Sequence, residues 1–296
     1  MTSELSRIGE RLRAYRLGAG LSIDDMARKL NLSRATTYRL EKTGINSIDA
    51  LERVAKVLGV SVASLMGVEI EYIVNAVTYF ERLRQIEREA EWSFVAFGPI
   101  SYLLTSDEYD RVLKQSLFDQ VPFDVADRQQ RIAMIGEILG ILAKRKSDYR
   151  KRRPALTNVL SAADIERFAR NGLASGESPL PLDSEQRRAA VAELKLIAEM
   201  LVRPPLGVQI GILFDTLPTT GFNMMRRGDG TVLSVSPFRL GPHLNIRKGV
   251  ATITSMQEAV TLYDRLATDM WEQASKGTQA AEFVLSQIEI AEHLLR

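Results

Sequence analysis

Apolar positions recur with helical spacing in two short runs between residues 22 and 44, separated by a tight turn. The first run has one apolar face, formed by Ile23, Met26, Ala27 and Leu30. Ser22 stands where an N-cap is expected. The acids Asp24 and Asp25 follow in the first turn, where their negative charges interact favourably with the positive end of the helix dipole. This pattern predicts a helix that begins directly after Ser22.

A second helix is expected after the turn residue Asn31. Ser33 is its predicted N-cap, and Gly44 is its predicted C-cap. Three residues are expected to face inward, namely Thr36, Thr37 and Leu40. Five are expected to lie outward or to flank that face, namely Arg34, Ala35, Tyr38, Arg39 and Lys42. Two short helices that meet at a tight turn, the second exposing arginines, are typical of a protein that places a helix in a DNA groove.

Three further helices are predicted around this pair. The first has an amphipathic pattern made by Ile8, Leu12, Tyr15 and Leu17. The next follows the cap residue Ser47 and has its apolar positions at Ile48, Leu51, Val54, Ala55 and Leu58. Val62, Leu65 and Met66 indicate a short last helix. The N-terminal segment is therefore expected to be a mainly α unit of five helices.

This segment resembles the Xre or lambda-repressor-like helix-turn-helix family. The residues that match its usual pattern are Leu12, Arg13, Arg16, Gly20, Leu21, Ser22, Ala27, Leu30, Ser33, Thr36, Leu40, Glu41, Gly44, Leu51, Ala55, Leu58, Gly59, Val60 and Leu65. Thr37 departs from the pattern, because the family usually carries an aliphatic β-branched residue there. We expect this substitution to loosen the packing of the second helix of the pair slightly.

The resemblance implies that residues 33–42 form the recognition helix, which enters the major groove of DNA. The positions that would face the bases are Arg34, Ala35 and Arg39. The planar fork of an arginine matches the O6 and N7 acceptors of guanine, a contact worth roughly 1–3 kcal/mol of discrimination, so we expect guanine in the half-site. Ala35 suits a thymine methyl group. The alternative is that Arg34 and Arg39 lie on a solvated helix face and contact no base.

Other residues of this surface are expected to contact phosphates and to position the protein without reading sequence. Hydroxyl groups suited to that role belong to Ser33, Thr36 and Tyr38. The complete set of expected DNA-binding residues is Ser22, Ser33, Arg34, Ala35, Thr36, Tyr38, Arg39 and Lys42. Arg16 and Glu41 are excluded from it, because the resemblance implies that they form a structural ion pair between the first helix and the recognition helix.

Composition agrees with a globular protein that binds DNA through its N-terminal part. Hydrophobic residues make up 45% of the 296 residues, which excludes wholesale disorder and allows two or three domains. The net charge is only +2, yet residues 1–66 hold 11 Lys and Arg against 7 Asp and Glu. This basic excess lies where DNA is expected to bind.

Several classes of site are not expected. Cysteine is absent, which excludes disulfides and thiolate metal sites, and His243 and His293 are too far apart in sequence to suggest a histidine site. We therefore expect no structural metal and no cofactor. The first residues lack the apolar core of a signal peptide, and no uninterrupted apolar run is long enough for a membrane span. These features predict a cytoplasmic protein without membrane contact.

Residues 69–88 predict one long helix with an apolar stripe. The stripe consists of Ile70, Ile73, Val77 and Phe80, with Leu83 and Ile86 less regularly placed. Such a stripe needs a partner, and we favour the same helix of a second subunit, because the resembled family usually acts as symmetric dimers. Two recognition helices about 34 Å apart would then read an inverted repeat. An intramolecular connector helix is the alternative.

From residue 89 onward, strands are predicted among the helices. The expected strands are 92–97, ending at Gly98-Pro99, then 154–160, 208–214, 221–227 and 231–238, with Gly228-Asp229-Gly230 as a hairpin turn. The expected helices are 106–117, 125–145, 161–172 with Ser161 as cap and Gly172 as stop, 183–203, 255–274 and 278–295. We therefore expect a DNA-binding domain over 1–67, a linker or dimerisation helix over 68–88, and a mixed α/β sensing or regulatory domain over 89–296.

The C-terminal part resembles the poorly characterised sensing domain that follows Xre-type units in many bacterial regulators, particularly those of actinobacteria. The matching pieces are EREAEWSFVAFGPISYLLTSDEYDRVL, DRQQRI, ALTNVLSAADIERF, ELKLIAEML, GVQIGIL and TLYDRLATDMWEQA. The last third is also similar to phospholipase-D-like sensor domains, which implies a distantly related fold. It does not imply catalysis, because the enzyme family needs a lysine two residues after its histidine, and His243 is followed by Leu244 and Asn245.

Three other groups of residues have alternative interpretations. Residues 144–153 carry seven basic residues and one acid, and are expected to be a solvated loop or helix end unless they contact phosphate, an acidic ligand or an acidic partner. Four apolar side chains are expected in the core rather than in a ligand pocket, namely Phe214, Phe222, Met224 and Met225. A surface loop is expected around His243, Arg239, Arg247 and Lys248, and an anion site there is the alternative.

Together these patterns favour a bacterial transcriptional regulator. We expect a repressor that binds an inverted-repeat operator in double-stranded DNA as a homodimer, modulated by a small-molecule or protein effector at the C-terminal domain. The alternative is an antitoxin-like autoregulator whose C-terminal domain binds a partner protein. The sequence has no glycine-rich phosphate loop, no recognisable Ser-His-Asp set and no paired-carboxylate signature, so we do not expect an enzyme. A phosphodiesterase that uses His243 is the remaining enzymatic alternative.

Overall fold

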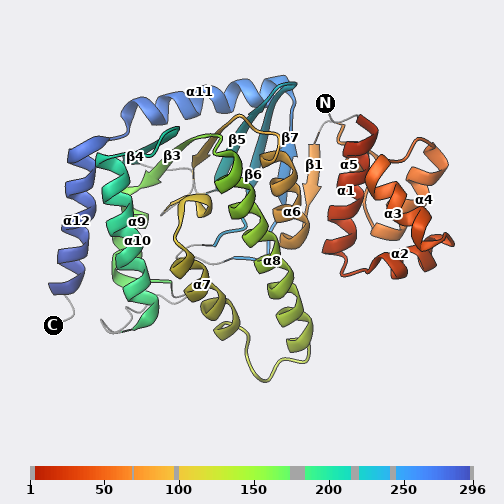
Figure 1. Ribbon diagram of the computed structural model, residues 1–296, viewed down its shortest axis with the longest axis horizontal. Coiled ribbons are helices and arrows are strands. Elements are labelled where there is room, and N and C mark those ends of the chain that lie inside the picture. Colours follow the sequence, from red (N-terminus) through yellow and green to blue (C-terminus); the bar gives the residue numbers. More distant parts are fainter. Residues whose placement is uncertain are drawn as a thin grey trace.

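The N-terminal unit of the computed structural model consists of helices α1 to α5 (Figure 1). Their bounds are Glu4–Gly18, Ile23–Leu30, Arg34–Thr43, Ile48–Leu58 and Val62–Met66. Over the whole chain, the structure describes residues 4–68, 70–96, 100–173, 184–214, 220–240 and 245–293. The core of the unit is formed by buried apolar side chains such as Leu12, Met26, Val54 and Leu65.

The predicted N-caps of this unit are confirmed. The side chains of Ser22, Ser33 and Ser47 each accept a backbone N–H of the helix that follows. Ile48 departs from its predicted core position, because it lies in the first turn of α4 and is 71% exposed. The buried face of α4 begins one turn later, at Leu51.

The described residues after the N-terminal unit are built on a mixed seven-stranded sheet. Its strands are β1 (Ile70–Ile73), β2 (Trp92–Ala96), β3 (Ala155–Ser161), β4 (Val208–Leu213), β5 (Gly221–Arg227), β6 (Gly230–Ser236) and β7 (Ala251–Thr254). They lie in the order β1-β7-β6-β5-β2-β3-β4, in which β2–β3 and β3–β4 are parallel and the other pairs antiparallel. The predicted mixed α and β character and the predicted hairpin between β5 and β6 are confirmed.

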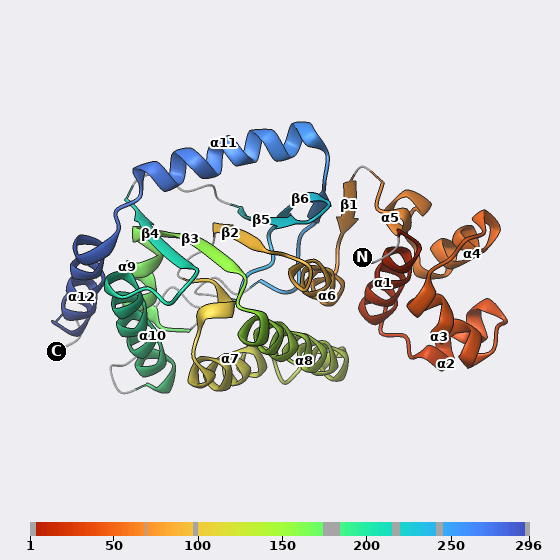
Figure 2. The same cartoon turned by 45° about the horizontal axis from the view of Figure 1, so that its top comes forward.

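Helices cover both faces of this sheet (Figure 2). Helix α11 (Gln257–Gln273) crosses one face and packs on β4, β5 and β6. The opposite face carries α6 (Ala76–Glu87), the short helix η1 (Tyr102–Leu104), α7 (Asp107–Asp119) and α8 (Arg128–Arg152). At the β4 end, α9 (Ala162–Asn171), α10 (Glu185–Val202) and α12 (Gly277–His293) pack together.

Residues 70–73 show that the prediction of one long helix over 69–88 is wrong. They form β1, an edge strand antiparallel to β7, and α6 begins only at Ala76 after the cap residue Asn75. Helix α6 is buried on nearly every side, because it lies between α1 and α8. Its apolar stripe is thus covered within a single chain, as the intramolecular alternative states, and it has no free face for a second subunit. The linker or dimerisation helix predicted over 68–88 is therefore part of the C-terminal fold.

The other C-terminal expectations have mixed outcomes. Residues 144–152 continue α8 beyond its predicted end, which agrees with a helix end. The expectation that this segment is solvated is wrong for Arg145 and Lys146, because both are buried and pair with Glu87 and Asp110. Phe222, Met224 and Met225 are fully buried core residues, as expected, whereas Phe214 is 56% exposed. Strand β7 has no counterpart among the predicted strands. Three features that the prediction singled out lie outside the described residues, namely Phe97, Gly98-Pro99 and His243.

None of the described helices combines the length and the apolar character needed to cross a bilayer. The part of the chain that the structure describes also contains no group of three or more His, Cys, Asp or Glu side chains arranged to hold a metal ion.

Candidate nucleic-acid interface

The turn between α2 and α3 is defined by side-chain caps at both helices. At the start of α2, Ser22 Oγ accepts the Asp25 N–H at 3.0 Å while the Asp25 carboxylate accepts the Ser22 N–H at 3.0 Å, which is a complete capping box. Asn31 ends α2 in the left-handed conformation with φ of 55°. Ser33 Oγ then accepts the Thr36 N–H at 3.1 Å and starts α3. The local sequence therefore determines where each helix of the pair begins.

The inner face of α3 packs closely on α1. Thr37 is completely buried, and its hydroxyl donates to the Ser33 carbonyl at 3.1 Å, so the polar group has a partner inside the core. Gly9 of α1 permits the close approach, because a Cβ there would lie 2.6 Å from the carbonyl oxygen of Glu41. Gly44 ends α3 with φ of 87°, which confirms the predicted C-cap.

Arg16 and Glu41 form the structural ion pair that the family resemblance implies. Two guanidinium nitrogens of Arg16 donate to the two carboxylate oxygens of Glu41, at 2.5 and 3.2 Å. A third nitrogen donates to the Leu21 carbonyl at 2.6 Å, just before α2. Both charged residues are buried, so the pair joins α1, the start of α2 and the end of α3 in a fixed geometry.

The outer face of α3 is open to solvent. Seven of the eight predicted DNA-binding residues are exposed, namely Ser22, Ser33, Arg34, Ala35, Tyr38, Arg39 and Lys42. Thr36 is half-buried, and its hydroxyl lies 2.8 Å from Ser33 Oγ. The structure therefore presents on one accessible helix most of the polar groups that the sequence singles out.

The three exposed basic side chains of α3 differ in their contacts with neighbouring residues. Arg34 pairs with Asp24 of α2 at 3.3 Å, and the Lys42 ammonium lies 5.7 Å from the centre of the Tyr38 ring. The Arg39 guanidinium makes no ion pair or hydrogen bond with the described residues. Contacts between exposed charges are weak, so all three cations can be redirected toward a ligand at small energetic cost.

Helix α1 lies between helix α3 and helix α6 of the C-terminal part (Figure 1). The contact between α1 and α6 is tight, because a Cβ at Gly18 would lie 1.8 Å from the Thr78 hydroxyl oxygen. At the centre of the contact, Glu71 of β1 accepts from Arg82 at 2.7 and 2.9 Å and from Arg11 of α1 at 2.9 Å. These buried charges tie the helix-turn-helix unit to the sheet.

The electrostatics of this cluster favour its charged form. Burial opposes ionisation of Glu71, but the adjacent Arg82 and Arg11 more than offset it, so the pKa of this carboxyl lies below its ordinary value. Burial likewise opposes the charge of Arg82, and Glu71 more than offsets it, raising the pKa of that guanidinium. The sequence gives no sign of this cluster, because acids and arginines in a polar stretch are normally assigned to the surface.

A second set of polar contacts flanks the cluster. Gln85 of α6 donates to the Glu10 carbonyl of α1 at 2.9 Å. Glu81 of α6 lies 3.7 Å from the Arg13 guanidinium of α1 and accepts two hydrogen bonds from Arg84 at 2.9 Å. The interface between the two parts of the chain is therefore polar and extensively paired, a kind of contact that responds to charge changes nearby.

Comparisons with known proteins agree with the N-terminal assignment. Residues 7–65 match the family model described as a helix-turn-helix domain, so this unit is a helix-turn-helix DNA-binding domain. No curated protein sequence matches the chain. A solved structure of TrmBL2, described as an archaeal chromatin protein with a novel mode of DNA binding, is similar over 90% of this chain and 93% of that chain, with 12% identity and a TM-score of 0.31. That score is too low to support a conclusion about fold or function.

Proposed function

We propose that this protein is a sequence-specific transcriptional regulator of the Xre type that reads the DNA major groove with α3. The observation that carries the proposal is the outer face of α3, where Arg34, Ala35, Arg39 and Lys42 are exposed on a helix held rigidly from behind. A helix whose orientation is fixed by buried bonds can place side chains against base edges with the accuracy that direct readout needs.

The residues of this face have different roles in the proposal. Arg39 and Arg34 bind guanine, Arg34 after releasing Asp24, and Ala35 contacts a thymine methyl group. Ser22, Ser33, Thr36, Tyr38 and Lys42 bind phosphates and set the register on the duplex.

The regulator binds an inverted repeat as a homodimer and acts as a repressor. Symmetric half-sites match a two-fold protein, with recognition helices about 34 Å apart. Because α6 is covered by α1 and α8, the subunits meet through another surface. The C-terminal part receives an effector and passes its influence to α3 through α1, which contacts both. No catalytic role is part of this proposal.

Selection of sheared genomic DNA by the purified protein, followed by sequencing, tests the proposal. A guanine-containing inverted repeat, bound at least about 1000-fold more tightly than random DNA at physiological salt, is the expected result. Sedimentation of the complex should give two protein chains per repeat. Uniform, salt-sensitive recovery without a motif would contradict sequence-specific regulation, because phosphate contacts alone produce that behaviour.

A further inference from the structure

Five basic side chains gather at the end of the sheet where β2 and β3 begin. They are Arg88 at the end of α6, Lys151, Arg152 and Arg153 at the end of α8, and Arg226 near the end of β5, and all five are exposed. We call this surface the basic end. Residues 151–153 belong to the charged run for which a phosphate contact is the alternative to a solvated helix end.

Hydrogen bonds join the elements that carry the basic end. Arg152 donates to backbone carbonyls of the last residues of α6 and the turn after it, that of Arg88 among them. The Glu91 N–H donates to the Arg226 carbonyl at 2.8 Å, and the Ala155 N–H donates to the Glu91 carbonyl at 3.1 Å. The five cations therefore come from three elements but lie at one end of the sheet.

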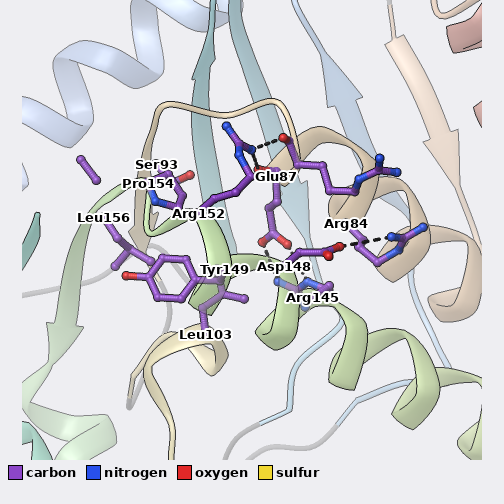
Figure 3. Close-up of a pocket in the computed structure, with 12 residues that line it drawn as sticks. Arg84, Glu87, Ser93, Leu103, Arg145, Asp148, Tyr149, Arg152, Pro154 and Leu156 are labelled. Atoms are coloured by element: carbon purple, nitrogen blue, oxygen red, sulfur yellow. Dashed lines mark hydrogen bonds and ion pairs between the residues drawn. The ribbon is translucent and has the colours of Figure 1, made fainter. Parts of the chain in front are cut away.

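The acids closest to the basic end are paired with other arginines. Figure 3 shows two of these pairs, Glu87 with Arg145 and Asp148 with Arg84. The other acid–base contacts beside this surface join Arg7 and Arg227 to Glu89 and Asp229. Among the described residues, no ion pair involves Arg88, Lys151, Arg153 or Arg226. The charge of the basic end is therefore not neutralised by neighbouring acids.

The basic end carries more positive charge than two helix ends require. Helices α6 and α8 both end here, and each helix C-terminus carries about half a negative charge. Glu91 is exposed at this end and adds one negative charge. Five cations against about two negative charges leave an excess of about three positive charges. Basic residues that only balanced the two helix dipoles would leave no such excess.

We propose that the basic end binds the phosphate backbone of duplex DNA, as a second contact beside that of α3. The chain has a helix-turn-helix DNA-binding domain, so duplex DNA is the polyanion that it brings close to this surface. Duplex DNA carries one negative charge per about 1.7 Å of its axis, which suits a group of exposed cations without a shaped pocket. Phosphate contacts carry no sequence information, so the basic end adds affinity while α3 reads the bases. The inference rests on the DNA-binding role of α3 in the proposed function, but not on its sequence specificity.

The N-terminal half of α1 lies between the two DNA contacts. At the end of α3, a Cβ on Gly44 would lie 1.7 Å from the Leu5 carbonyl oxygen of α1. Two residues further along α1, Arg7 pairs at 2.6 Å with Asp229, in the turn that follows Arg226 and β5. The end of α3 and the basic end are thus both next to the start of α1. A duplex that extends beyond the base pairs under α3 contacts both.

The salt dependence of binding to a long duplex of random sequence measures the phosphate contacts. The logarithm of the affinity falls with the logarithm of the salt concentration, with a slope of about 0.9 for each phosphate contacted. Four cations are replaced by glutamine in one variant, namely Arg88, Lys151, Arg153 and Arg226. Arg152 is kept, because its hydrogen bonds join α8 to α6. We expect the slope to become less negative by about 2 to 4.

A matched control removes the same charge elsewhere. It replaces four exposed cations of α7, α9, α10 and α11 by glutamine, namely Lys114, Arg170, Lys195 and Arg265. The slope of this control should stay within about one unit of the wild type. Equal changes in both variants would assign the effect to net charge and overturn the proposal. An unchanged slope in the first variant would overturn it as well, and would favour an acidic protein as the partner of this surface.

Folding of both variants is checked by circular dichroism and urea unfolding. If the fourfold variant does not fold, Lys151→Glu alone keeps the proposal testable, because it changes one exposed residue at the end of α8. It should make the slope less negative by at least about one unit, and an unchanged slope in this variant would overturn the proposal.

The ratio of affinities for selected and random DNA separates this proposal from the proposed function. The fourfold variant should lower both affinities by the same factor and leave their ratio within about twofold of the wild type, because the basic end reads no bases. A larger loss of the ratio would contradict a pure phosphate contact. A ratio near one in the wild type would refute sequence-specific regulation, and the salt test on random DNA would still decide for or against the basic end.

Discussion

Replacing Glu71 of β1 with glutamine removes the acid that Arg11 of α1 and Arg82 of α6 share at the centre of the α1–α6 contact. The carboxylate is 5% exposed and accepts hydrogen bonds from Arg11 and Arg82, whose side chains are 11% and 5% exposed. Glutamine has nearly the same shape, so the substitution tests the charge rather than the packing. It leaves two guanidinium groups close together without their shared counter-ion.

The expected magnitude follows from burial. Removing one partner of a buried ion pair usually costs about 3–5 kcal/mol, mainly because the remaining charge stays desolvated. Glutamine keeps one oxygen that still accepts a hydrogen bond, and Arg82 also donates to Gln85 at 2.6 Å. We therefore expect Glu71→Gln to lower the free energy of unfolding by about 3 kcal/mol, at the lower end of that range.

Urea unfolding followed by circular dichroism measures this loss. The matched control is Glu52→Gln on the exposed face of α4, which should change the free energy of unfolding by less than about 0.5 kcal/mol. Hydrogen exchange of the α1 amides should also accelerate in Glu71→Gln, since α1 loses its central contact. A loss no larger than that of the control would refute the view that this cluster holds the two parts together.

The same pair of proteins gives a pH prediction. Arg82 and Arg11 hold the pKa of Glu71 below its ordinary value of 4.5 in the folded protein. A lowered folded pKa means that the contribution of the charge is complete above the ordinary pKa and is lost as the pH falls through the folded pKa. The difference in stability between wild type and Glu71→Gln should therefore be constant at neutral pH and shrink below about pH 4. A difference that grows on acidification would contradict the charged state assigned to Glu71.

Further predictions concern the helix-turn-helix unit and α8. Gly44→Ala should lower the melting temperature and reduce the free energy of unfolding by at least about 1 kcal/mol. The reason is that φ is 87° and the new Cβ would lie 1.7 Å from the Leu5 carbonyl oxygen. Gly140→Ala, in the exposed interior of α8 with open space around it, should instead raise the stability by about 0.5–1 kcal/mol, and a loss there would contradict the geometry of α8. Glu41→Ala should cost about 3–5 kcal/mol in urea unfolding because it leaves Arg16 buried and unpaired, and a loss below about 1 kcal/mol would contradict the structural role of the pair.

The helix-turn-helix unit is the part of the molecule that sequence reasoning predicts best. Its helices carry local signals, such as the Ser22 and Ser33 caps and the Gly44 stop, and these signals act within a few residues of the chain. The hairpin of β5 and β6 is predictable for the same reason, since its turn residues at 228–230 are diagnostic by themselves. The exposure of Arg39 also follows from helical spacing once α3 is assigned.

The junction between the two parts could not be predicted, because its structure depends on distant partners. Ile70 and Ile73 are spaced like helical positions, yet β7, almost 180 residues later, pairs with this segment as a strand. Glu71 and Arg82 have the composition of surface residues, and only the folded chain shows that they bury one another's charge. Strand β7 is too short, at four residues, to produce a pattern of its own.

The central claim, that α3 reads DNA sequence, is tested most directly by the ratio of affinities for a selected genomic fragment and for random DNA of the same length. Arg39→Ala should reduce the difference in binding free energy that corresponds to this ratio by roughly 1–3 kcal/mol, because a base contact contributes only to the specific complex. Arg53→Ala, which removes an exposed charge from α4, should leave the ratio unchanged, since any phosphate contact it makes contributes to both complexes. An unchanged ratio for Arg39→Ala would contradict the assignment of this arginine to base recognition, and a ratio near one for the wild type would contradict sequence-specific binding itself.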